Sequence, residues 1–315
     1  MSGDENNPHA GEPSRKRSSL ALHMGPRKKV FALCNYPALL TGGILRLEEL
    51  QDSPIEDYPA DVRREHRVFM ELVDSYPGLL ERLAAGEEED IIHVGDLIGK
   101  GASGARGDDT KTLKSASDRG FNHEVTGGLL CPAGLDWSNV ETKQSLKSGE
   151  TAVHGDQWPM FLYAGYVYDP DAPWQGLLRS NILICGFKHI FTSPSSVEKE
   201  PKATRSGNAY LHGMKSMTKG SLAYIATQVR FSLSSSSVFS RTDTVTDSEN
   251  FYHSILDLLE DPDKTEEVAD LMTWWTWRIF PNSSSSQQSI SKNSALFKIQ
   301  EKCAALRALA NADAN

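Results

Sequence analysis

The sequence predicts an all-α, predominantly helical fold, and two observations support this prediction. Apolar residues recur at helical spacing along much of the chain between residues 30 and 281, and no convincing run alternates apolar and polar residues as a half-buried strand does. The 315 residues are 39% hydrophobic and include 11 Phe, 9 Tyr and 6 Trp, enough to fill a sizeable core. We therefore expect a single irregular multi-helix domain over residues 30–281.

The first predicted helices lie between residues 59 and 105. Apolar side chains share one face over residues 59–76, and Pro77-Gly78 ends that helix. A short leucine-rich helix over residues 79–86 follows. Four acidic residues, 87–90, then stand where a helix N-terminus favours negative charge, ahead of apolar residues at helical spacing up to Ala105.

Four later helices are predicted in the second half of the domain. They lie around Leu177–Phe191, Ser221–Ser232, Ser248–Glu260 and Lys264–Arg278. Asp261-Pro262-Asp263 separates the last two, because the residue before a proline avoids the helical region. The last helix carries Trp274, Trp275 and Trp277, whose rings could stack nucleic-acid bases but are better explained as core anchors.

Residues 1–29 are predicted to form a disordered basic arm, since they contain six Lys or Arg, three Asp or Glu and almost nothing to bury. Two basic clusters in the arm are ten residues apart, and they are typical of a two-part nuclear import signal: Arg15 and Lys16, then Arg27, Lys28 and Lys29. The alternative is that short basic clusters are simply common in disordered tails. The signal would place the protein inside the cell, in the nucleus.

The C-terminal end is predicted to be a tethered helix. Residues 282–293 are a Ser/Gln-rich linker by composition, and residues 294–312 follow as an amphipathic helix. Its apolar positions alternate in steps of three and four, as in a coiled-coil seam: Leu296, Ile299, Cys303, Leu306 and Ala310. Two heptads are too few for an independent coiled coil, so this helix either binds a partner helix or docks on its own core.

The motifs and residue spacings predict neither a cofactor site nor a metal site. Gly99-Lys100-Gly101-Ala102-Ser103-Gly104 resembles the glycine-rich loop of a protein kinase, but no other kinase motif occurs, and the surrounding helical spacing favours a small-residue face for helix packing. The four cysteines are 97, 54 and 118 residues apart, and no histidine pair has a metal-ligand spacing. No apolar run of 18 residues predicts a membrane span.

Two short sequence segments, which we call the polar strings, each place charged residues, an asparagine and a histidine close to a glycine. They are Lys114 to His123 and Lys202 to Met214, and their candidate polar residues are Asp118, Arg119, Asn122, His123, Arg205, Asn208 and His212. In a functional interpretation, the arginines bind an anion while His123 or His212 acts as the acid-base group. In the structural interpretation, which we favour, Asp118 and Arg119 form a buried ion pair, the glycines make turns, and the asparagines satisfy buried backbone groups or cap helices.

These strings also carry a family resemblance, together with other segments in the same order: Trp158 to Tyr163, Gly176 to Arg179, His189 to Ser196, and Trp274-Trp275. The chain resembles a domain family of unknown function that is multiplied in mushroom-forming fungi. The resemblance covers roughly residues 30–281. It implies a fungal source and a high-copy gene associated with mobile elements, and it implies no activity or catalytic residue.

The charge is unevenly distributed along the chain, although the total is −9. Residues 44–96 carry a net −10 and residues 243–270 a net −9, whereas residues 179–230 carry a net +6. Such a basic block attracts phosphate-bearing partners, unless it pairs internally with the acidic helices. The candidate anion-binding residues in it are Arg179, Lys188, Lys202, Arg205, Lys215 and Lys219.

Three function hypotheses follow. The first is a non-enzymatic nuclear interaction protein that binds nucleic acid or a phosphorylated partner through residues 179–230. The second is an enzyme for a small anionic substrate, with its site formed by the two polar strings. The third is a structural module that binds a partner through the helix over residues 294–312.

Overall fold

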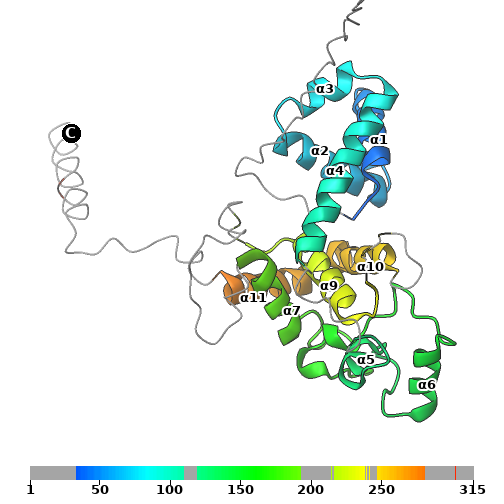
Figure 1. The fold of residues 1–315 in the computed structure, drawn as a ribbon. Coiled ribbons are helices and arrows are strands. Elements are labelled where there is room, and N and C mark those ends of the chain that lie inside the picture. The colour runs from blue at the N-terminus through cyan, green and yellow to red at the C-terminus, as the bar shows by residue number, and fades with distance from the viewer. Residues whose placement is uncertain are drawn as a thin grey trace, which may run out of the picture.

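The computed structural model describes residues 33–109, 119–192, 214, 216–237, 239, 241, 247–280 and 302 (Figure 1). Helices are the regular elements of this part of the chain, and no strand occurs in it, so the all-α prediction is confirmed. The α-helices are α1 (Tyr36–Glu49), α2 (Ala60–Ser75), α3 (Leu79–Ala85), α4 (Glu88–Asp109), α5 (Glu124–Leu130), α6 (Val140–Ser148), α7 (Asn181–Phe187), α9 (Lys219–Leu233), α10 (Ser248–Glu260) and α11 (Thr265–Ile279).

Helices α1 to α4 make up an N-terminal unit, residues 36–109, with a buried core of its own. The Asn35 side chain accepts a hydrogen bond from the Ala38 N–H and so caps α1. The long helix α4 runs beside α1 in the upper part of Figure 1. The buried side chains of this core are Tyr36, Leu39, Leu40, Phe69, Leu72, Leu79, Leu83, Ile91 and Val94.

Two glycines allow the N-terminal unit to pack closely. A Cβ on Gly95 of α4 would lie 2.6 Å from the Pro37 Cα atom of α1, and one on Gly43 would lie 2.2 Å from the Phe69 ring. The glycine-rich string that begins at Gly99 lies inside α4, so it is helix rather than a phosphate-binding loop. A Cβ added at Gly99 would lie 3.7 Å from the Tyr36 ring, an ordinary van der Waals distance, so the close approach of α4 to α1 requires a glycine at Gly95 rather than at Gly99.

The C-terminal unit, residues 119–280, surrounds helix α9. The side chains on almost every face of α9 are buried; Leu222, Ile225 and Ala226, for example, are fully buried. Helices α5, α7 and α10 pack against α9, which lies near the centre of this unit in Figure 1. The core is rich in large aromatic side chains, and the fully buried ones are Phe161, Phe187, Phe191, Phe251 and Trp275.

An ion-pair joint connects the two units. On α2, Arg64 lies 2.7 Å from the Asp257 carboxylate and 2.8 Å from the Glu260 carboxylate of α10, and Arg67 also pairs with Glu260. His253 of α10 is hydrogen-bonded to the backbone of Leu33, which lies three residues before the N-terminal unit begins at Tyr36. The acidic block over residues 243–270 is therefore partly neutralised by arginines of the N-terminal unit.

The predicted helices were found with small differences in their bounds. Residues 177–180 are not helical as predicted, because the Ser180 side chain accepts from the Leu183 N–H and caps α7 at that point. After α7 the chain continues as a wide π turn, Lys188–Thr192. Helices α1, α5 and α6 were not predicted, since the first two contain paired glycines and the third buries only Leu146.

Several predictions fall on residues outside the described part of the chain. They are the basic arm over residues 1–29, the linker over residues 282–293 and nearly all of the helix over residues 294–312. In the part that is described, no helix is both long and apolar enough to cross a membrane.

Candidate functional site

Arg179, a predicted anion-binding residue, lies over the indole ring of Trp274. Its guanidinium carbon is 5.4 Å from the ring centroid, and both side chains are half-buried. A guanidinium over an indole face is attracted by the ring quadrupole, while the donors on its edge still suit a phosphate or carboxylate. The pairing thus holds a cation at a defined place on the C-terminal unit.

The backbone before Arg179 is strained and tightly held. Leu178 has a φ of +55°, in the left-handed region that only glycine adopts readily. The Trp275 indole N–H donates to the Leu178 carbonyl oxygen over 2.9 Å, and both residues are buried. Such strain persists only where surrounding contacts enforce it, and it is often found at functional sites. Trp275 therefore fixes the turn that directs Arg179 toward Trp274.

Other cations lie around the C-terminal end of α11. Arg278 is exposed in the last turn of that helix. Lys219, also exposed, begins α9 two residues after Met217, whose N–H donates to the Thr276 hydroxyl of α11. Lys188 follows Phe187, whose ring contacts those of Trp275 and Phe280. These contacts bring α7, α9 and α11 together at this end of the C-terminal unit (Figure 1).

Trp277 is largely exposed, with 64% of its surface accessible, so its prediction as a core anchor was wrong. Trp275 is the core anchor, and Trp274 packs partly against the same core. The apolar stripe of α11 follows Val268, Leu271 and Trp275, and Trp277 falls off this stripe. That spacing is the sequence signal that could have identified it as a surface residue.

We call Arg179, Lys219, Trp274, Trp277 and Arg278 the α11 terminal cluster. Acidic residues of the same helix lie at its other end, where Glu266, Glu267 and Asp270 are exposed. This order of charges suits the helix dipole, which favours acids at the N-terminus and bases at the C-terminus. The dipole does not account for an exposed tryptophan beside the bases.

One member of the basic block lies in the core. Arg230 is only 6% exposed, and its guanidinium carbon is 4.5 Å from the centroid of the Phe251 ring. It therefore contributes little positive charge to the surface, and the net +6 of residues 179–230 overstates what a partner would meet.

The first polar string has a structural arrangement where it is described. Arg119 donates to the carbonyl oxygens of Ser232 and Ser236 over 3.1 and 3.5 Å. Gly120 has a φ of +77°, and its N–H donates to the Leu233 carbonyl oxygen over 2.7 Å. Arg119 and Gly120 thus tie the start of the C-terminal unit to the end of α9.

His123 caps helix α5. Its Nδ1 atom accepts from the Thr126 N–H over 3.4 Å, and the Thr126 hydroxyl donates to the Gly120 carbonyl oxygen over 2.8 Å. Asn122, which was expected to cap a helix or to satisfy buried groups, is exposed. The other candidates of the two strings lie outside the described residues: Asp118, Arg205, Asn208 and His212. The predicted anion-binding residues Lys202 and Lys215 also lie outside them.

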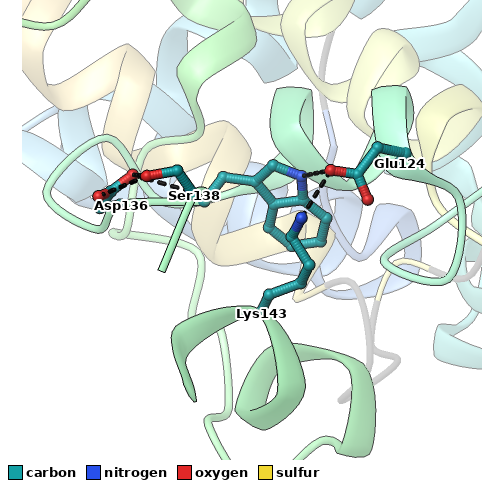
Figure 2. A network of polar contacts seen from close by, with 5 residues as sticks. Glu124, Asp136, Ser138 and Lys143 are labelled. Carbon is teal, nitrogen blue, oxygen red and sulfur yellow. Dashed lines mark hydrogen bonds and ion pairs between the residues drawn. The ribbon is translucent and has the colours of Figure 1, made fainter. Parts of the chain in front are cut away.

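A second polar network joins α6 to α5 (Figure 2). The Trp137 indole N–H and the Lys143 ammonium both donate to Glu124, over 3.1 and 2.6 Å. The Lys143 hydrogen bond lowers the pKa of the Glu124 carboxyl. The Trp137 ring packs on Gly127, where a Cβ would lie 2.4 Å away, and Lys143 and Lys147 lie 5.1 and 5.8 Å from its centroid. Its exposed face is thus already covered by the chain's own cations.

The loop between these two helices is stabilised in a similar way. The Ser138 hydroxyl and N–H donate to the Asp136 carboxylate over 2.7 and 2.8 Å, as Figure 2 shows, and these bonds lower the pKa of Asp136. The Asn139 side chain then accepts from two N–H groups at the start of α6. These hydrogen bonds stabilise the turn and satisfy the side chains of Asp136 and Asn139 within the chain itself.

Two buried groups of the C-terminal unit, the Cys131 thiol and the Tyr163 hydroxyl, have little nucleophilic character. Burial raises the pKa of the Cys131 thiol to about 11, which keeps it protonated at neutral pH. Burial likewise raises the pKa of Tyr163 to about 12. No group of three His, Cys, Asp or Glu side chains in this part of the chain is placed to hold a metal ion.

The described residues define a helical protein with a cationic and aromatic surface at one end of α11. The chain belongs to a family of unknown function, DUF6698, which matches residues 113–280. Helices α1 to α4 lie before the matched region, and the α11 terminal cluster lies within it. No curated protein and no solved structure matches the chain.

Proposed function

We propose that this chain is a non-enzymatic interaction protein that binds a phosphate-bearing partner, nucleic acid or a phosphorylated protein, through the basic residues of 179–230. The α11 terminal cluster is the described part of the proposed contact surface. The observation that supports it best is Arg179, which the strained Leu178 turn and the Trp275 hydrogen bond hold over Trp274. A cation fixed in this way loses little conformational entropy on binding.

The proposed chemistry is electrostatic and depends on salt. Lys and Arg that contact phosphates release condensed counterions, so the affinity falls steeply as the salt concentration rises. Lys219 is exposed at the start of α9 and Arg278 is exposed in the last turn of α11. The sequence adds Lys202, Arg205 and Lys215 between α7 and α9. The acidic helices lower long-range attraction, so we expect a moderate affinity that is confined to this end of the molecule.

The proposal is tested by binding the full chain to fluorescein-labelled oligonucleotides and to a phosphoserine peptide, over a range of salt concentrations. We expect an affinity that falls with salt and that drops further when Lys202, Arg205 and Lys215 are replaced by Ala. Binding that is absent for every phosphate-bearing probe, or that does not respond to salt, would contradict the proposal.

A nuclear site of action is part of the proposal, supported by the two basic clusters of the arm. Replacing Arg27, Lys28 and Lys29 by Ala in a fluorescently tagged chain should move it from the nucleus to the cytoplasm. An unchanged distribution would argue against the import signal. A fungal source and a link to mobile elements likewise remain predictions of the family resemblance.

A further inference from the structure

We infer that the α11 terminal cluster binds single-stranded nucleic acid by stacking bases on Trp277 and on the Arg179–Trp274 pair. This inference rests on the proposed function and narrows it from any phosphate-bearing partner to an unpaired strand of DNA or RNA. It also adds Trp277, a residue that charge alone would leave without a role.

The exposed indole favours a base as the group to be recognised. Trp277 is 64% exposed although its neighbour Trp275 is fully buried, so α11 presents one tryptophan to the core and another to the solvent. Every nucleobase has a flat apolar face that stacks on an indole. A phosphorylated side chain needs arginines and backbone donors, and it makes no use of an indole.

The spacing of the two aromatic positions fits consecutive stacking. Trp274 and Trp277 are three residues apart on α11, so they are neighbours on the helix surface. The Arg179 guanidinium is itself a planar cation over Trp274, and planar guanidinium groups also stack on bases. An unpaired strand can place one base on each of these surfaces.

The neighbouring charges suit the backbone of the strand. Exposed Arg278 follows Trp277 directly. Exposed Lys219 is two residues from Met217, whose N–H donates to the Thr276 hydroxyl of α11. Alternating aromatic and cationic side chains are typical of grooves for single strands, in which phosphates meet cations while bases stack. In a duplex the bases are already stacked on each other, so the indoles would gain nothing from it.

Three variants at two adjacent positions test the inference. Trp277→Leu keeps an apolar side chain without a ring, Trp277→Phe keeps a smaller ring, and Arg278→Gln removes the adjacent charge. Because base stacking on an aromatic side chain is worth about 1–3 kcal/mol, we expect Trp277→Leu to weaken binding by about 5- to 150-fold. Trp277→Phe should retain most of the affinity, and Arg278→Gln should flatten the salt dependence.

The measurement is fluorescence anisotropy of the full chain with four probes: oligo(dT), oligo(U), a mixed-sequence duplex of equal length, and a phosphoserine peptide. Circular dichroism and a thermal melt of each variant check that the fold is retained, and Val140→Ala, at a 65% exposed position on α6, is the matched surface control. We expect both single strands to bind more tightly than the duplex or the peptide.

The outcomes separate this inference from the proposed function. If Trp277→Leu binds every probe as the unmodified chain does, while Arg278→Gln weakens binding, the surface recognises charge alone and the stacking inference is wrong. Equal affinity for duplex and single strand, or preference for the phosphopeptide, overturns it as well. Loss of self-association in Trp277→Leu, measured by sedimentation, would assign the indole to a contact between copies. Absence of salt-sensitive binding to all probes would remove the proposed function itself.

Discussion

The two units of the chain are both helical, yet they differ in how their aromatic side chains are used. In the N-terminal unit the fully buried aromatic side chain is Phe69, and the rest of the core is mainly Leu, Ile and Val. In the C-terminal unit several aromatic rings fill the core, and two further indoles lie at or near the surface of α11. The strained residues Leu178, Tyr166 and Asp247 also lie in the C-terminal unit. The contact surface that we propose lies in the C-terminal unit, which the family match also covers.

The largest expected effect tests whether the two cores are separate. Trp275→Ala removes a fully buried indole and its hydrogen bond to Leu178, so we expect a loss of about 3–5 kcal/mol in the stability of the C-terminal unit. Hydrogen exchange should show lost protection in α7, α9 and α10, with α1 and α4 protected nearly as before. Equal loss of protection in α1 and α4 would mean that the two cores unfold as one.

A smaller effect is expected from a glycine that allows α4 to approach α1. Gly95→Ala would place a methyl group 2.6 Å from the Pro37 backbone, which cannot move without shifting α1, so we expect a cost of about 3 kcal/mol, the upper end for overpacking. Gly101→Ala on the same helix is the matched control, since nothing lies within 4 Å of the added methyl group and alanine favours helix. Urea denaturation of both variants checks this difference, and equal midpoints would contradict the packing argument.

The joint between the units should contribute less than either core. Arg64→Ala breaks the pairs with Asp257 and Glu260, and because Asp257 is largely exposed we expect a loss of only about 1–2 kcal/mol. Arg63→Ala removes an equal charge from an exposed position one residue away and should change stability by less than about 0.5 kcal/mol. Thermal denaturation at low and high salt compares them. A loss for Arg63→Ala as large as that for Arg64→Ala would show that charge, rather than the joint, is responsible.

The smallest expected effect is a pH dependence at the same joint. Burial, with a further contribution from Arg64, lowers the pKa of His253, so the folded chain favours the neutral ring. The unfolded chain takes up the proton first as the pH falls below about 6.5, so stability is full above that value and declines below it, toward the lowered pKa of the folded state. His66 of α2, whose pKa burial also lowers, acts in the same direction.

Urea denaturation between about pH 7.5 and 5.5 measures this slope, above the range in which carboxylates titrate. His253→Gln should flatten the slope, and His253→Gln combined with His66→Gln should flatten it further. A slope that is unchanged in the double variant would show that neither ring is responsible.

Sequence patterns predicted the helices with a continuous apolar stripe and missed those that tertiary contacts stabilise. Helix α10 has the predicted bounds because its apolar face is regular and Pro262 follows it closely. Helix α1 contains paired glycines that favour coil, but Gly43 is needed for the contact with Phe69. Helix propensity cannot report that a side chain from another helix requires the space.

The candidate site was predicted only in part, for a related reason. The charge count identified Arg179, but nothing in the local sequence shows that it lies over Trp274, about 95 residues further along the chain. Arg119 and His123 drew attention as polar residues near a glycine, and the structure has them holding backbone groups. Our structural interpretation had instead paired Arg119 with Asp118 and assigned the backbone contacts to the asparagines. Whether a polar side chain binds a ligand or its own backbone depends on contacts distant in sequence.

The central claim, that binding belongs to the C-terminal unit and to fixed positions in it, is tested most directly by two charge-matched double variants. Arg179→Gln with Arg278→Gln removes two positive charges from the α11 terminal cluster, and Arg63→Gln with Arg82→Gln removes two from exposed positions of the N-terminal unit. Affinity for labelled oligo(dT) at a fixed salt concentration is the measurement. We predict that the first pair loses most of the binding and that the second pair retains it. Equal loss in both would show that net charge alone governs binding and would contradict the claim.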